Sequence, residues 1–272
     1  MATQTKKKSK RSPKNKKAEN KFFTRKRIIL LAVSTAAVIA IILCAVFVRG
    51  TGYKKNEIGD LKDKAWGIDV SSHNGKIDWK KVSSKADFAF VRVGYRGYAN
   101  GEINLDKRAK ANLKGANRNG VPVGVYFYSQ AINDKEAEEE AEFLLSKIKE
   151  YNITLPVVID FEFANKDGKD VGRLAEAKLS KKQKTSLVNA FCDKVRKAGY
   201  TPGIYASSYI YRSHFNMKDI PKDVFIWVAD YNIAVTYGGS YDIWQYSDKG
   251  SCDGVSSEYV DMNYFYTNNR IE

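Results

Sequence analysis

The regular alternation of strand-like and helix-like segments is the feature that most restricts how this chain can fold. Five apolar segments of strand length are separated by stretches of helical pattern, and three more follow with spacers too short for full helices. Strands that alternate with helices pair in parallel and are joined by right-handed crossovers. The eight segments are WGIDVSS (66–72), DFAFVRVG (87–94), VPVGVYFYS (121–129), LPVVIDFEF (155–163), TPGIYASS (201–208), DVFIWVADY (223–231), YDIWQYSD (241–248) and EYVDMNYFY (258–266).

The helical segments complete the prediction of the fold. We expect helices within residues 105–120, 134–151 and 180–199, the last with Ser180 as its N-cap. Five β-α units followed by three strands predict an α/β fold, a modified TIM-like (β/α)5(β)3 barrel with a partly missing ring of helices. An open doubly wound sheet is the alternative, but no glycine-rich phosphate loop follows the first strand.

The basic charge is concentrated at the N-terminus. Residues 1–27 contain 12 Lys or Arg and one acid, Glu19, so this tail carries +11 of the formal net charge of +15. The excess therefore belongs to a polar tail rather than to a folded basic face, and nucleic acid is not expected as a partner.

An uncharged apolar segment follows this tail. Residues 28–48 form a run of 21 residues, and roughly 20 apolar residues cross a bilayer as a helix. The sequence therefore predicts a single N-terminal transmembrane helix before the barrel. A cleaved signal peptide is the competing interpretation, although its apolar region is usually about 7–15 residues long.

Flanking charge predicts the orientation of this helix. Arg25, Lys26 and Arg27 precede it, and only Arg49 lies just beyond it. Positive charge stays on the cytoplasmic side, so we expect a cytoplasmic tail (1–27) and an extracellular domain. A linker (49–65) then joins the membrane to the domain at 66–272. The helix and the basic tail would contact membrane lipids.

The cysteines and histidines carry little information. Cys44 lies in the apolar segment, which leaves Cys192 and Cys252 outside it. Because Cys192 falls on a helical pattern and two isolated cysteines form no framework, we expect no bridge between them. The chain has two His residues and neither CxxC nor HExxH spacing, so a structural zinc site is not expected.

Polar side chains recur near the ends of the predicted strands. Active sites of such barrels lie at the carboxyl ends of the strands, and we expect these side chains to meet there. They are Asp69, Arg92, Tyr126, Tyr128, Asp160, Glu162, Tyr205, Trp227, Asp230, Tyr231, Gln245, Tyr246, Asp261 and Asn263.

Four of these side chains are acids that point to catalysis. Asp160 and Glu162 project from the same face of a strand, about 6.6 Å apart at Cα from a rise of ~3.3 Å per residue. Asp69 and Asp261, on the first and last strands, become neighbours when the barrel closes. Crowded carboxylates cannot all ionise, so at least one keeps its proton. A protonated acid beside ionised ones is what glycosidic cleavage requires.

Acids at strand ends can also have structural roles. A single acid there is commonly a cap or turn former, and Asp78 and Asp87 are assigned to that class. Burying two unpaired acids costs free energy, so Arg92 is a candidate structural partner of the pair in 155–163. A Ca²⁺ or Mg²⁺ site is the other chemical alternative, but no oxygen-rich loop supports it. We expect neither metal nor cofactor.

The aromatic residues fit a sugar-binding groove. Trp66 and Trp79 are expected in the core, whereas Tyr128, Trp227 and Tyr246 are better candidates for the groove. Aromatic faces pack against sugar rings, and Tyr hydroxyl groups donate hydrogen bonds to them.

Five motifs in this order resemble glycoside hydrolase family 25. They are GIDVSSHNG, VVIDFEF, IWVADY, IWQYS and VDMN, and the similarity extends over residues 66–270. The resemblance implies a lysozyme that cuts the β-1,4 bond between N-acetylmuramic acid and N-acetylglucosamine in bacterial peptidoglycan. It also implies a modified (β/α)5β3 barrel.

The resemblance assigns roles to the acids. Glu162 becomes the proton donor, and Asp160 the acid that assists the substrate's acetamido group or stabilises the intermediate. Asp69 and Asp261 match two further acids that line the site. Phe127 departs from the family pattern, because many relatives carry His there, and the stereochemical route stays open.

The sequence thus predicts a membrane-anchored, monomeric muramidase of the bacterial cell membrane, acting on wall within reach of its linker. The 17 residues of 49–65 span at most about 60 Å at ~3.5 Å per residue. A catalytically silent peptidoglycan-binding scaffold is the first alternative. A polysaccharide deacetylase or other metal hydrolase, which a chelator would inhibit, is the second.

Overall fold

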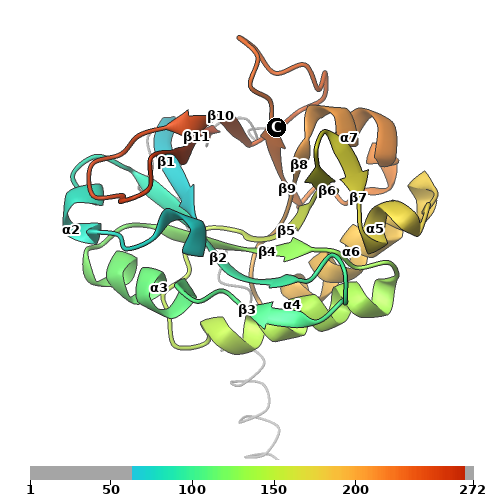
Figure 1. The fold of residues 1–272 in the computed structure, drawn as a ribbon, viewed down its shortest axis with the longest axis horizontal. Helices are drawn as coiled ribbons and strands as arrows, with labels where there is room; N and C mark the ends of the chain where they lie inside the picture. Colours follow the sequence, from blue (N-terminus) through green and yellow to red (C-terminus); the bar gives the residue numbers. More distant parts are fainter. Residues whose placement is uncertain (1–62, 267–272) are drawn as a thin grey trace, which may run out of the picture. The chain divides into compact units, whose positions relative to one another are not determined.

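The computed structural model describes residues 63–266, and these form a closed barrel (Figure 1). Eight strands within this range follow one another around the barrel, and pairing of the first with the second in the chain closes it. In barrel order they are β1 (Lys64–Val70), β11 (Val260–Tyr266), β10 (Ile243–Gly250), β9 (Phe225–Ala229), β8 (Pro202–Ser207), β5 (Val157–Phe161), β4 (Val123–Ser129) and β2 (Phe88–Arg96). The eight predicted strands and the closed barrel are confirmed, and the open sheet is excluded.

The last strand runs against its neighbours. Parallel pairing joins β1 to β2 and continues through β4, β5, β8 and β9 to β10, as expected. In contrast, β11 is antiparallel to both β10 and β1. No helix lies between β10 and β11 to carry the chain back across the barrel. Asp261 therefore reaches the active end of the barrel from the start of its strand rather than from its end.

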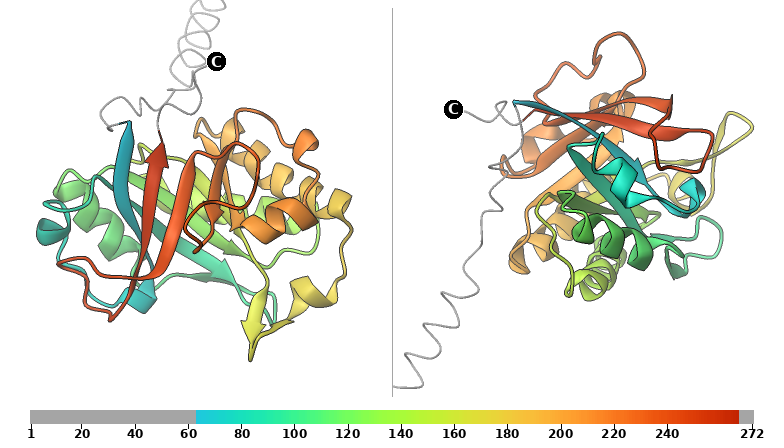
Figure 2. Two further views of the ribbon diagram at one scale, coloured as in Figure 1. Left: turned by 90° about the horizontal axis from the view of Figure 1, so that it is seen from above. Right: turned by 90° about the vertical axis from the view of Figure 1, so that its left-hand side faces the viewer.

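Three long helices cover one side of the barrel. The helices α3 (Ala109–Arg118), α4 (Asp134–Ile148) and α6 (Lys181–Lys197) confirm the three predicted ones. Figures 1 and 2 show them on the side of β2, β4 and β5, while β10 and β11 have no comparable cover. Shorter helices are α2 (Trp79–Val82), α5 (Arg173–Glu176), α7 (Ser208–His214), η1 (Ser72–Asn74) and η2 (Met217–Asp219).

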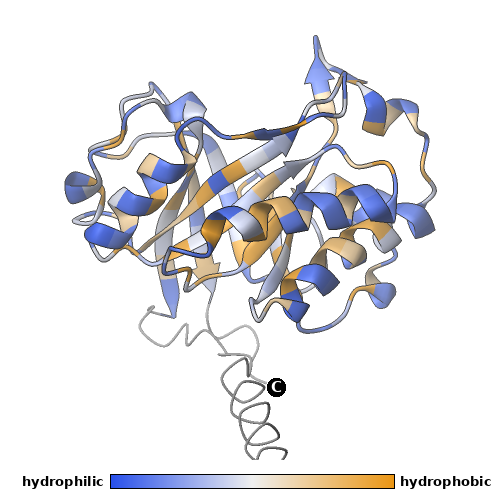
Figure 3. Ribbon diagram, turned by 90° about the horizontal axis from the view of Figure 1, so that it is seen from below, coloured by the Kyte–Doolittle hydropathy of each residue, from blue (hydrophilic) through white to orange (hydrophobic). Residues whose placement is uncertain are grey.

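Local sequence explains where the long helices begin and how they pack. The Ser180 hydroxyl accepts a hydrogen bond from the amide of Gln183, whose side chain accepts from the amide of Ser180, so α6 starts with a capping box. In α4, buried Ala137, Ala141, Leu144 and Ile148 recur at helical spacing. Figure 3 shows hydrophilic residues on the outer turns of the helices and hydrophobic residues along the strands behind them.

Aromatic side chains fill the interior of the barrel. Phe90 lies 4.5 Å from Trp227 between ring centroids, and Tyr205 lies 4.9 Å from it. The barrel is thus a packed core rather than a pore. Trp79 is buried, as predicted, between helices and strands, whereas Trp66 is only half-buried.

Three short strands were not predicted. Strand β3 (Ile103–Leu105) adds to the end of β2, and β6 (Ala164–Lys166) pairs with β7 (Lys169–Val171) in a hairpin. Each has only three residues, which is shorter than the alternation of about 4–8 residues that identifies a strand in a sequence. An Asp-Gly turn at 167–168, with positive φ at both residues, closes the hairpin. Figure 2 shows this hairpin projecting past the end of the barrel toward which the parallel strands run.

Part of the predicted organisation falls near or beyond the described range. The predicted tail (1–27), transmembrane helix (28–48) and most of the linker (49–65) lie outside the described residues. Within residues 63–266, no helix has the length and apolar character needed to cross a membrane. Strand β1 starts at Lys64, slightly before the first strand expected from the sequence. Cys192 and Cys252 are both buried free cysteines.

Packing inside the barrel generates a stability prediction at Gly124 in β4. A Cβ atom there would lie 2.2 Å from Cε1 of Phe90, whose ring is held against Trp227. We expect Gly124→Ala to lower the free energy of unfolding by about 1–3 kcal/mol, measured by urea denaturation. Gly203→Ala is the control, since its nearest contact is Cγ2 of Val158 at 3.0 Å. Equal losses for the two variants would contradict this account of the packing.

Candidate active site

A cavity of about 930 Å³ lies at the end of the barrel where the parallel strands finish. The barrel strands supply about half of its lining, and the segments that follow β1, β3 and β5 or precede β11 supply the rest. The lining residues are Asp69, Ser71, Ser72, His73, Asn74, Arg92, Tyr95, Lys107, Tyr126, Tyr128, Asp160, Glu162, Tyr205, Trp227, Gln245, Ser257, Glu258, Tyr259 and Asp261. All four acids predicted from the sequence therefore meet in one cavity.

Asp69 and Asp261 form a proton-sharing pair. The two residues are opposite each other in the β1–β11 register and within hydrogen-bonding reach. Burial raises the pKa of Asp69, and burial followed by the charge of Asp69 raises the pKa of Asp261 to about 9. Asp261 therefore keeps its proton at neutral pH and donates it in a hydrogen bond to Asp69.

Two amides hold Asp69 in place. Its Oδ2 accepts hydrogen bonds from Nε2 of Gln245 at 2.9 Å and from Nδ2 of Asn263 at 2.8 Å. The Gln245 Oε1 in turn accepts from the hydroxyl groups of Tyr205 at 2.8 Å and Tyr231 at 2.7 Å. These bonds offset the cost of burying a carboxyl group that is only 4% exposed.

Asp160 and Glu162 face the cavity from the end of β5. Asp160 is 5% exposed, and within the described part of the chain its Oδ1 has no hydrogen-bond partner. Burial, then the charges of Glu162 and Asp69, raise the pKa of Asp160. Burial, then the charge of Asp69, raise the pKa of Glu162 to about 7. The four carboxyl groups titrate together, and the cluster holds protons at neutral pH.

Arg92 does not form an ion pair with this cluster. Its Nε donates to Oδ2 of Asp106 at 2.9 Å, and its Nη2 donates to Oγ of Ser72 at 3.3 Å. Between residues 63 and 266, no ion pair joins Arg92 to Asp160 or Glu162. The structural alternative, in which Arg92 pairs with the two acids, is therefore not supported, and Arg92 instead lines the cavity as a predicted site residue. Its charge still acts across the cavity, where it opposes the rise in the pKa of Glu162.

The predicted aromatic lining is partly in place. Tyr126, Tyr128 and Tyr205 line the cavity, and burial raises the pKa of each hydroxyl. Trp227 also lines it but is only 2% exposed, with its Nε1 donating to Oδ1 of Asn263 at 2.9 Å. Trp227 therefore forms the floor of the cavity and belongs mainly to the core.

Four predicted site residues lie outside the lining of this cavity. Asn263 donates a hydrogen bond to Asp69, and the hydroxyl group of Tyr231 donates one to Gln245. Tyr246 accepts a hydrogen bond from Nε1 of Trp66 at 2.9 Å and stacks on Tyr264. The fourth residue is Asp230.

Asp230 organises the loop that follows β9. Its carboxylate accepts hydrogen bonds from Ser208, Asn232 and Thr236. Burial alone would raise the pKa of Asp230, but these hydrogen bonds outweigh it and hold the pKa below its ordinary value. Its contacts are those of a loop anchor.

Sequence reasoning missed the loop residues of the cavity. His73 and Asn74 lie in η1 and within the GIDVSSHNG motif, and Ser257, Glu258 and Tyr259 directly precede β11. The motif was the signal that could have found the first group. The buried Asp106, which orients Arg92, reads in the sequence as an ordinary residue before a helix.

The predicted structural acids are where the sequence suggested. Asp78 caps α2 by accepting hydrogen bonds from the amides of Lys80 and Lys81, and Asp87 accepts one from the amide of Trp66. Among the residues that the structure describes, no group of three or more His, Cys, Asp or Glu side chains is arranged to hold a metal ion.

Comparison with known proteins decides the family. The family model described as glycosyl hydrolases family 25 matches residues 68–255. The chain belongs to this family. The resemblance seen in the sequence motifs is confirmed, and the protein is a glycoside hydrolase of the lysozyme type.

Named relatives fit this assignment. The autolytic lysozyme of Clostridium acetobutylicum is 28% identical over 202 residues, which cover 73% of this chain and 55% of that protein. Lysozyme M1 of Streptomyces globisporus is 28% identical over 230 residues, or 79% and 73% of the two chains. The autolysin LytC of Streptococcus pneumoniae, solved with a synthetic peptidoglycan ligand, is 31% identical with a TM-score of 0.63. That match covers 75% of this chain and 47% of LytC, so the chain spans about half of LytC.

The raised pKa of Asp261 predicts a dependence of stability on pH. A carboxyl group whose pKa is higher in the folded state binds protons more tightly there, so the free energy of unfolding falls as pH rises above about 4. We expect Asp261→Asn, whose amide still donates to Asp69, to increase the free energy of unfolding by about 1–2 kcal/mol at pH 8. At pH 4 the two proteins should unfold alike.

Urea denaturation at the two pH values measures this difference. Asp253→Asn, at an exposed position, is the matched control and should change nothing at either pH. A stabilisation by Asp261→Asn that is equal at pH 4 and pH 8 would contradict a proton held by Asp261.

Proposed function

We propose that this protein is a peptidoglycan hydrolase that cleaves the β-1,4 bond between N-acetylmuramic acid and N-acetylglucosamine. The convergence of four carboxyl groups in one cavity is the observation that carries this proposal, and the raised pKa values of Glu162 and Asp261, caused first by burial, support it. Membership of glycosyl hydrolase family 25 and similarity to named lysozymes support the substrate class.

Glu162 is the general acid of this proposal. Its pKa of about 7 keeps a proton available at neutral pH, and the glycosidic oxygen must receive a proton as the bond breaks. Glu162 is also the more exposed member of the pair at the end of β5. It can therefore approach a bound sugar from the cavity wall.

Asp160 acts at the sugar carbon that becomes positively charged. Its buried Oδ1 has no partner among the described residues, so it is free to orient the acetamido group or to stabilise the cation. Asp69 and Asp261 act behind it, because their shared proton sets the charge that Asp160 and Glu162 experience.

The remaining wall of the cavity binds the glycan. The hydroxyl groups and ring faces of Tyr126, Tyr128 and Tyr205 suit sugar rings. Arg92, held by Asp106, presents its remaining guanidinium N–H groups toward the cavity for polar substituents.

The N-terminal sequence supports tethering of this domain to the outer face of the cell membrane. The apolar run 28–48 is long enough to cross a bilayer, and the basic tail before it favours an orientation with the wall-cutting domain outside the cell, next to its substrate. The basic tail attracts anionic lipid headgroups on the inner face. The protein would act as a monomer on nearby wall rather than as a released enzyme.

Glu162→Gln tests the catalytic proposal. We expect release of reducing ends from purified peptidoglycan to fall about 10²–10⁴-fold, since the amide cannot donate the proton as the acid does. Binding to insoluble wall should persist. Mass spectrometry of the products that the unmodified protein releases should find N-acetylmuramic acid at the new reducing end.

Glu150→Gln, at an exposed position in the turn after α4, is the matched control and should retain full activity. Wall binding by the unmodified protein without any cleavage would instead identify a silent scaffold. Loss of cleavage on addition of a chelator would indicate a metal hydrolase.

Protease accessibility tests the tether. In intact protoplasts that express the full chain, an added protease should cut within residues 49–65 and release the folded domain, because this linker lies outside the membrane. An epitope at the N-terminus should stay protected until the membrane is lysed. Recovery of the domain mainly from the culture medium without protease would contradict anchoring.

A further inference from the structure

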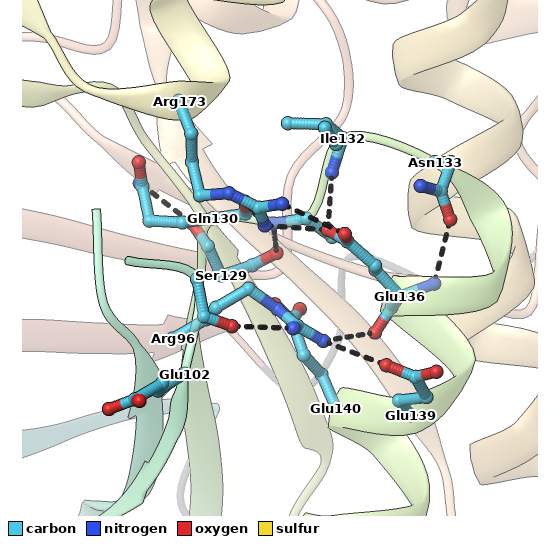
Figure 4. Close-up of polar contacts among 12 residues, drawn as sticks. Arg96, Glu102, Ser129, Gln130, Ile132, Asn133, Glu136, Glu139, Glu140 and Arg173 are labelled. Carbon is cyan, nitrogen blue, oxygen red and sulfur yellow. Dashed lines mark hydrogen bonds and ion pairs between the residues drawn. The ribbon is translucent and has the colours of Figure 1, made fainter. Parts of the chain in front are cut away.

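A network of buried and half-buried polar side chains bonds to the backbone of Glu162, and the catalytic steps above do not use it. Figure 4 shows this network. It joins Arg96 at the end of β2, Gln130 after β4, Glu136 and Glu140 of α4, and Arg173 at the start of α5. Burying a charged network generally costs more free energy than apolar packing of the same volume. Such a network does, however, form directional hydrogen bonds that hold particular backbone groups in place.

Gln130 is the point at which this network touches the active site. Its side chain is fully buried, and its Nε2 donates to the backbone carbonyl oxygen of Glu162 at 2.9 Å and to that of Ser129 at 2.8 Å. Its own backbone carbonyl oxygen accepts a hydrogen bond from Nη1 of Arg173 at 2.9 Å. Gln130 therefore bonds to both Glu162 and Arg173, the two ends of the segment that contains the β6–β7 hairpin.

The sheet itself does not hold Glu162. The β4–β5 ladder ends with the pair Ser129 and Phe161, and the β5–β8 ladder ends with Asp160 and Tyr205. Asp160 is thus fixed from both sides, whereas Glu162 follows the last paired residue. The side-chain amide of Gln130 supplies the next bond in place of the missing ladder.

Arg173 anchors the far end of the same segment. Its guanidinium binds the carboxylate of Glu136 through two hydrogen bonds of 2.6 and 2.8 Å, and its amide donates to the carbonyl of Tyr98 at 2.9 Å. Glu136 also accepts from the amide of Ile132 at 3.1 Å. The hairpin is therefore tied to α4 and to the turn after β2.

Arg96 fixes α4 itself. Its Nε donates to Oε1 of Glu140 at 2.7 Å, its Nη2 to the carbonyl of Glu136 at 3.0 Å, and its Nη1 to the carbonyl of Gly101 at 2.8 Å. Figure 4 shows the two arginines on either side of Gln130 and Glu136. These hydrogen bonds fix α4, and through Arg173 they also hold the backbone of Gln130.

We propose that Gln130 is a positioning residue that holds the backbone of Glu162 so that its carboxyl group points into the cavity. This inference rests on the proposed role of Glu162 as proton donor. A general acid must lie within hydrogen-bonding reach of the oxygen that it protonates, and small displacements cost much of its effect. Glu162 also owes its raised pKa first to burial, so a looser backbone would return that pKa toward its ordinary value.

Gln130→Met is the direct test, because methionine has nearly the same length but cannot donate. We expect kcat/KM on solubilised peptidoglycan to fall about 10–100-fold. The alkaline limb of the pH profile, which reports loss of the Glu162 proton, should move to lower pH by about half a unit or more. Hydrogen exchange, measured by mass spectrometry, should be faster in residues 162–173 of the variant than in the same residues of the unmodified protein, and should change less in the rest of the domain.

Gln130→Asn is the second variant, in case the first does not fold. It keeps an amide but is one methylene too short to reach the carbonyl of Glu162, so the same limb shift and local exchange are expected. Val188→Ala, a buried apolar change in α6 that removes none of the hydrogen bonds of the network, is the control. It should lower Tm without moving the pH limb.

The outcomes separate this inference from the proposed function. An unchanged pH limb and unchanged exchange in residues 162–173 for a folded Gln130 variant would overturn the inference while leaving the hydrolase intact. If the unmodified protein does not cleave wall at all, the proposed function fails. Hydrogen exchange then still decides whether Gln130 holds this segment.

Discussion

Burial of four carboxyl groups in one cavity, with repulsion among them as the second cause, is the constraint on which the chemistry of this protein depends. Burial disfavours the charge of each acid, and for Asp160, Glu162 and Asp261 neighbouring charges add to that cost, so the cluster retains protons at a pH where isolated acids would lose them. The same repulsion makes the site a source of instability. A well-packed barrel interior around Phe90 and Trp227 supplies the stability that offsets it.

Closure of the barrel is what brings the acids together. Asp69 and Asp261 are separated by almost the whole domain in sequence, yet β1–β11 pairing puts them opposite each other. The antiparallel direction of β11 is essential here, because it delivers Asp261 from the start of the strand to the same end of the barrel where β5 finishes. The order and direction of the strands therefore determine which carboxyl groups are neighbours, and so contribute to the raised pKa of Asp261.

The barrel and the position of its acidic site were predictable from the sequence, because both follow from local patterns of apolar and acidic residues. Contacts between distant residues were not. Strand and helix periodicity identified the barrel, and the costly acids of VVIDFEF pointed to the site. The direction of β11, the Arg92–Asp106 pair and the contacts of Gln130 depend on which side chains meet across the fold. The local sequence pattern does not show which residues far apart in the chain contact each other in the fold. Asp230 and Tyr246 were chosen for lying at strand ends, but their partners are other protein groups.

The most direct measurement is a ¹³C NMR titration of the side-chain carboxyl groups in the unmodified protein. We expect Glu162 to titrate near pH 7 and Asp261 to remain protonated until about pH 9. Chemical shifts showing both carboxyl groups fully ionised by pH 5 would contradict the proposed chemistry, because no member of the cluster would then hold a proton for catalysis.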